Sequence, residues 1–124
     1  MIATSIEQSK KLVELGIDPS TADMCYKMFS TGDSKWLYEL IPCHPLEVDI
    51  PAWSLSALLE LMPSHIDKIG TFLRLRMDKS EEGFNIWYED YGTGLCVENS
   101  DIIESTPIDV AFEMVCWLKE NKHI

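Results

Sequence analysis

The feature that most constrains the fold is a change of hydrophobic period in the second half of the chain. Between Thr71 and Ser100, apolar residues recur at every second position, as is typical of strands with one buried face. The apolar set is Leu73, Leu75, Met77, Phe84, Ile86, Tyr88, Leu95 and Val97. The pattern predicts three antiparallel strands joined by glycine-containing turns at residues 79–83 and 91–94.

Three other segments have the spacing of helices. The first covers about residues 4–15 and ends at Gly16, and the second runs from the Ser54 cap to about Met62, before Pro63. The third begins at Thr106-Pro107 and runs to about residue 121.

The last helix has a broad apolar arc and a narrow acidic stripe, which includes Asp109 and Glu113. The arc consists of Ile108, Ala111, Phe112, Met114, Val115 and Leu118. An arc of this width predicts a helix that lies across a sheet.

Nearer the N-terminus, apolar and aromatic residues at 24–30 and 35–41 flank a Gly-Asp turn, which predicts a hairpin. The prolines from Pro42 to Pro51 argue against a regular element there. The predicted order is therefore α-β-β-α-β-β-β-α in one domain, residues 1–124. We expect an α+β fold in which an antiparallel meander sheet has helices packed on one face.

The charge is strongly acidic, with 21 Asp and Glu against 10 Lys and Arg in 124 residues. Residues 80–124 hold ten of the acids and only two basic residues, so the acidity is concentrated there. Nucleic acids and anionic membranes attract Lys and Arg, so this balance argues against direct binding to either. It is compatible with a basic protein partner.

The four cysteines, at positions 25, 43, 96 and 116, form no C-x-x-C pair. We see no secretory signal and no apolar run long enough to span a bilayer. We therefore expect a cytoplasmic protein with reduced, structural thiols, and no metal or other cofactor.

Catalytic motifs are weak in this sequence. Cys43 beside His44 is the one cysteine with a neighbouring base, but no third group is evident to orient the pair. Glu89 and Asp90 are adjacent in a predicted strand, so they point to opposite faces and cannot act on one substrate. We expect no catalytic residues, and a cysteine enzyme that uses Cys43 and His44 is kept as an alternative.

A candidate binding surface lies on the second face of the predicted sheet. If Met77 pairs with Phe84, Arg74 lies opposite Trp87, and the next turn places Glu98 on the other side of Trp87. Phe72, Arg76, Glu89 and Cys96 would surround this row. Such a cluster can simply cover a sheet face, but Trp and Arg are also the residue types enriched at binding hot spots.

Three segments together resemble a family of small, uncharacterised acidic proteins from gut anaerobic bacteria and their phages or mobile elements. They are Leu15–Pro19, Pro51–Pro63 and Ala111–Leu118. The resemblance implies a bacterial or phage accessory protein, and it supplies no activity, cofactor or catalytic residue.

The sequence thus favours a non-enzymatic binding or accessory protein. Its predicted partner-binding residues are Arg74, Trp87, Glu89, Glu98, Asp109 and Glu113. One alternative is a nucleic-acid mimic that blocks a basic DNA-binding protein through the acidic second half. Another is a homo-oligomer formed through a self-complementary apolar patch.

Overall fold

The computed structural model describes residues 2–33, 35–42, 44–68, 71–90, 92 and 102–124. It confirms the α+β class and the predicted order of helices and hairpin strands, with two antiparallel sheets. The chain divides into two compact units, Met1–Ala57 (unit 1) and Leu58–Ile124 (unit 2). Helix α2, Leu55–Leu61, spans the boundary between them.

Unit 1 begins with helix α1, Ile6–Glu14, which has a complete capping box. The Ser5 hydroxyl accepts a hydrogen bond from the Gln8 N–H, and the Gln8 side chain accepts one from the Ser5 N–H. The helix ends before Gly16, whose φ of 95° lies in the left-handed region that favours glycine. A short 3₁₀ turn, η1, follows at Pro19–Thr21.

The sheet of unit 1 has the strand order β2-β1-β3, and all its pairs are antiparallel. Strands β1, Met24–Ser30, and β2, Trp36–Pro42, form the predicted hairpin. Strand β3, Ile50–Ala52, was not expected, because it contains Pro51. Pro51 lies opposite Cys25, and the backbone N–H and C=O groups of Cys25 point toward β2 on the other side of β1. A residue at the position of Pro51 therefore makes no hydrogen bond to β1, so the missing N–H of proline costs nothing there.

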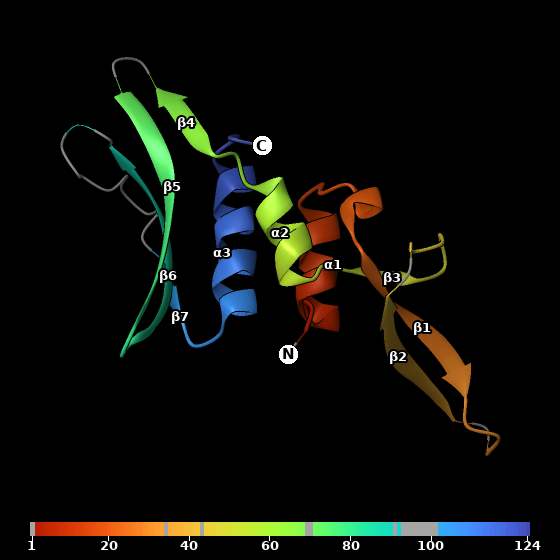
Figure 1. Ribbon diagram of the computed structural model, residues 1–124. Coiled ribbons are helices and arrows are strands. Elements are labelled where there is room, and N and C mark those ends of the chain that lie inside the picture. Colours follow the sequence, from red (N-terminus) through yellow and green to blue (C-terminus); the bar gives the residue numbers. More distant parts are fainter. Residues whose placement is uncertain (1, 34, 43, 69–70, 91, 93–101) are drawn as a thin grey trace. The chain divides into compact units, whose positions relative to one another are not determined.

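The described residues of the outer half of this hairpin, 28–33 and 35–38, are called the arm. Five large apolar side chains of the arm, on both faces of the ribbon, are 40–65% exposed. They are Met28, Phe29, Trp36, Leu37 and Tyr38. Figure 1 shows the hairpin extending away from α1, and its turn end has no other labelled element of unit 1 beside it. The apolar composition of the arm is therefore not explained by packing within unit 1.

The core of unit 1 is built around the fully buried side chains of Leu12, Cys25 and Trp53. The buried hydroxyls of Thr4 and Ser9 form hydrogen bonds inside this core. Thr4 Oγ1 accepts a hydrogen bond from the Trp53 N–H at 3.1 Å and lies 2.8 Å from Ser9 Oγ. The expectation of four reduced thiols is wrong at Cys25, which is disulfide-bonded. Spacing along the chain could not predict this bond, because tertiary pairing decides which cysteines meet.

Unit 2 contains a meander of consecutive strands. They are β4, His65–Lys68; β5, Thr71–Ser80; β6, Gly83–Asp90; and β7, Ile102–Glu104. Neither β4 nor β7 was predicted, and the predicted strand around residues 95–97 lies outside the described residues. Leu73, Ile86 and Tyr88 point to one face of this sheet and are buried.

The predicted register between β5 and β6 is wrong by two residues. Met77 lies opposite Ile86 rather than Phe84, because only Glu81 and Glu82 form the turn and β5 continues to Ser80. Since side chains alternate with a period of two, this slip leaves every residue on its predicted face. It does change which residues are direct neighbours.

Helix α3, Pro107–Glu120, begins as predicted at Thr106, whose hydroxyl accepts a hydrogen bond from the Asp109 N–H. All six residues of its predicted apolar arc are buried, and the helix packs on β6 and β7 (Figure 1). In the described part of the chain, no helix is both long enough and apolar enough to cross a membrane.

Candidate functional site

The candidate site is the face of the β4-β5-β6 sheet opposite the buried Ile86 and Tyr88, and it is called the Trp87 face. Strand alternation directs Trp87 and Glu89 of β6 to this side. The paired residues of β5 and β4 join them, and the Trp87 face is defined by His65, Asp67, Phe72, Arg74, Arg76, Trp87 and Glu89. The Asp78–Asn85 pair continues the same side of the sheet toward the β5-β6 turn. Three consecutive strands therefore hold aromatic, basic and acidic side chains together on one surface.

Arg76 and Glu89 are in polar contact on the Trp87 face. Arg76 lies directly opposite Trp87, and its Nε is 3.7 Å from Glu89 Oε2. Arg74 lies opposite Glu89 on one side and His65 on the other. The expectation that Arg74 faces Trp87 is wrong, and the two are diagonal neighbours because of the two-residue slip. Glu98, the third member of the expected row, lies outside the described residues.

Phe72 and His65 form the other half of the Trp87 face. Their rings stack with centroids 4.7 Å apart, although Phe72 remains 48% exposed. Sequence reasoning missed His65 and Asp67, because β4 is too short to show an alternating pattern. Their two-residue spacing after Pro63 was the only available signal.

Ser64, His65 and Asp67 are arranged like a hydrolytic relay. Ser64 Oγ is 3.2 Å from His65 Nδ1, and His65 Nε2 is 3.6 Å from Asp67 Oδ2. The Asp67 side chain, however, is 74% exposed and the His65 side chain 46% exposed. A catalytic relay depends on a buried acid that orients the imidazole and on a pocket that excludes water. This surface arrangement does not provide the buried acid.

The two predicted acidic positions of α3 do not belong to the Trp87 face. Asp109 lies in the first helical turn, where a carboxylate complements the positive end of the helix dipole. Glu113 is exposed one turn later on the acidic stripe. They form a separate candidate surface, because α3 packs against the β6-β7 part of the sheet and the Trp87 face lies on its opposite side.

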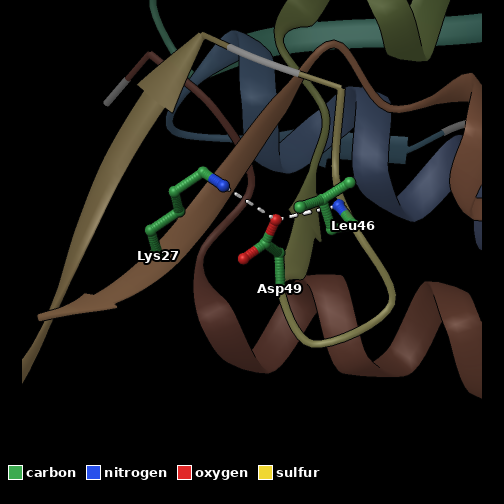
Figure 2. A network of polar contacts seen from close by, with 3 residues as sticks. All are labelled: Lys27, Leu46 and Asp49. Atoms are coloured by element: carbon green, nitrogen blue, oxygen red, sulfur yellow. Dashed lines mark hydrogen bonds and ion pairs between the residues drawn. The ribbon is translucent and has the colours of Figure 1, made fainter.

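Unit 1 contains a groove of about 520 Å³ between α1 and the segment around β3. Asp49 lines it, and its side chain is only 6% exposed. One carboxylate oxygen, Oδ2, accepts hydrogen bonds from the Leu46 N–H at 2.8 Å and from Lys27 Nζ at 3.2 Å. Figure 2 shows both contacts. The Leu46 hydrogen bond, and then Lys27, lower the pKa of the Asp49 carboxyl. These contacts give Asp49 a structural role, in which it ties the segment before β3 to β1.

The alternative cysteine site falls partly outside the structure. Cys43 is not among the described residues, and His44 is exposed on the segment after β2. Within the described ranges, no three His, Cys, Asp or Glu side chains form a group that could hold a metal ion.

Comparisons with protein-family models, with curated proteins and with solved structures find no match to this chain.

Proposed function

We propose that this protein is a non-enzymatic binding protein that engages a protein partner through the Trp87 face. The observation that supports the proposal is the cluster of Arg76, Trp87 and Glu89 beside the exposed ring of Phe72. Trp, Tyr and Arg are enriched among the residues that contribute most to protein interfaces. The Ser64, His65 and Asp67 side chains lack the buried acid that a catalytic relay needs.

The contacts within the cluster suit it to recognition. The Arg76 to Glu89 distance of 3.7 Å is long for an ion pair, and the side chains are 47% and 27% exposed. A partly solvated pair of this kind contributes little to stability, so its loss would barely affect folding. The same groups can gain strength when a partner removes water from them.

The acidic stripe on α3 supports the competing proposal of a nucleic-acid mimic. Its exposed residues include Glu113 and Glu120. A mimic binds a basic surface mainly by charge, so its affinity falls steeply as salt rises. A partner of the Trp87 face would be less sensitive to salt, because aromatic burial contributes more of the free energy of binding.

Affinity capture from native host lysate with the full chain, followed by mass spectrometry, identifies the partner. The purified partner is then titrated against Trp87→Ala, Phe72→Ala and Glu113→Lys. We expect the two face variants to weaken binding by about tenfold or more, the size of a hot-spot loss. Glu113→Lys should change affinity by less than about threefold.

Val48→Ala is the control, since it truncates an apolar side chain at a 90% exposed position in unit 1 that lies outside the Trp87 face and outside the arm. Circular dichroism of each variant checks that it is folded. Equal affinity of wild type and both face variants would reject the proposal. Loss of binding in Glu113→Lys alone, together with a steep salt dependence, would support the mimic instead.

A further inference from the structure

We propose that the arm is a self-association site, through which two copies of this chain join their β2 strands edge to edge. The proposal is independent of the Trp87 face, because it rests on unit 1 alone. The occupant of the site is a second copy of this chain in an antiparallel, two-fold symmetric arrangement.

The first observation is the open edge of β2. In the order β2-β1-β3 this strand is the last of the described sheet, so one row of its backbone groups has no partner strand. The Thr31 N–H donates to the Lys35 carbonyl, which makes residues 31 and 35 a hydrogen-bonded pair. Because hydrogen-bonded and non-hydrogen-bonded pairs alternate, the backbone N–H and C=O groups of Trp36, Tyr38 and Leu40 point outward from the hairpin. An uncovered edge with apolar side chains is a template for pairing with another chain.

The second observation is apolar area. A large apolar side chain exposes about 200 Å² when fully accessible, so the five exposed side chains of the arm present about 500 Å² per copy. Two copies offer about 1,000 Å², which is near the lower limit for a specific interface. Edge pairing covers only part of this area. We therefore expect a weak dimer, with a dissociation constant on the order of 10 µM or above.

The third observation is charge. The arm and its flanks contain Lys27, Lys35, Asp33 and Glu39, so residues 24–42 carry no net charge in a chain of net charge −11. Two copies can approach through this hairpin without the repulsion that acids elsewhere on the chain impose.

Charge also selects one register among the symmetric ones. With the two-fold axis at Leu37, each Lys35 lies opposite Glu39 of the second copy, and each Trp36 lies opposite its Tyr38. With the axis at Glu39 the two Glu39 carboxylates would face each other. With the axis at Trp36, Glu39 would face Asp33. With the axis at Tyr38, Lys35 and Glu39 would each face an apolar residue. The Leu37 register alone pairs opposite charges and aromatic rings together.

Sedimentation of the full chain at low salt, at up to about 300 µM, tests for the dimer. We expect concentration-dependent association in the wild type. Leu37→Asp, which places two carboxylates at the axis, should weaken association at least about tenfold. Val48→Asp is the matched control, because Val48 is 90% exposed in unit 1 but lies outside the arm, and it should associate like the wild type.

A charge exchange tests the register itself. Lys35→Glu and Glu39→Lys should each associate more weakly than the wild type, because each places like charges across the interface. An equimolar mixture of the two should recover association as a heterodimer, in which both cross-copy pairs are again opposite in charge. Recovery in the mixture cannot result from misfolding of either variant.

The proposal is overturned by a wild type that stays monomeric throughout this concentration range. It is also overturned if Leu37→Asp associates as strongly as the wild type, or if the mixture associates no better than its components. If the arm instead binds a different protein, the wild type stays monomeric and the proposal is wrong.

Discussion

The buried hydroxyl of Thr4 connects three segments of unit 1, and its removal tests how that unit is held together. Thr4 Oγ1 contacts both the Trp53 N–H and the Ser9 hydroxyl, and Thr4 and Ser9 are fully buried. Thr4→Val keeps the shape of the side chain but leaves both partners without this bond. An unsatisfied buried polar group costs about 1–3 kcal/mol, so we expect the free energy of unfolding to fall by about 2–4 kcal/mol.

Urea unfolding followed by tryptophan fluorescence measures this loss, with Thr4→Ser as the control. Thr4→Ser keeps the hydroxyl and loses one methyl group, which costs about 1 kcal/mol. In Thr4→Val combined with Ser9→Ala, the Ser9 hydroxyl is no longer stranded, so the double variant should be about 1 kcal/mol more stable than the sum of its parts. If Thr4→Val and Thr4→Ser differ by less than about 0.5 kcal/mol, the hydroxyl does not hold these segments together.

Three further predictions concern single positions. Gly83→Ala should destabilise the fold by about 2 kcal/mol or more in urea unfolding, because Gly83 has a φ of 137° and a methyl group there would overlap the Glu104 carbonyl oxygen. Tyr88→Phe should cost about 1 kcal/mol by the same measurement, because the Tyr88 hydroxyl donates to the Pro63 carbonyl at 2.7 Å; no loss would mean that this bond contributes nothing. The Asp49 carboxyl should titrate by NMR below the ordinary aspartate pKa, so the stabilisation from its contacts is present above the unfolded-state pKa and is lost as pH falls through the folded-state pKa. In Lys27→Met the Asp49 pKa should rise only in part, because the Leu46 hydrogen bond is the larger cause of its lowering.

Elements with local signals were predictable from the sequence. The start at Thr106-Pro107, the stop at Gly16 and the apolar arc of α3 act within a few residues, so sequence patterns locate the end of α1 and the whole of α3 well. The Ser5 capping box, which sets the start of α1, was not recognised. Strand β3 was not predictable, because its pairing with β1 bridges more than twenty residues and tolerates Pro51 only at one position of the ladder.

The candidate site was predictable in its face but not in its contacts. Period-two alternation assigns Arg74, Arg76, Trp87 and Glu89 to one side, and this holds for any even error in register. The contacts depend on the length of the turn at Glu81 and Glu82, which sequence patterns do not determine. The exposure of the arm was also hidden, since apolar residues on both faces of a hairpin ordinarily indicate burial.

Pro51 has a consequence for how far the first sheet can grow. At its place on the ladder the N–H would point away from β1, toward the outer edge of β3, and proline has none to offer. That edge therefore lacks the donor that an incoming strand needs, whereas the β2 edge keeps its donors. A sheet with one blocked edge and one open edge can pair with only one further sheet. The proposed pairing through β2 therefore gives a closed dimer. It leaves no edge from which a chain with such an apolar hairpin could grow into a fibre.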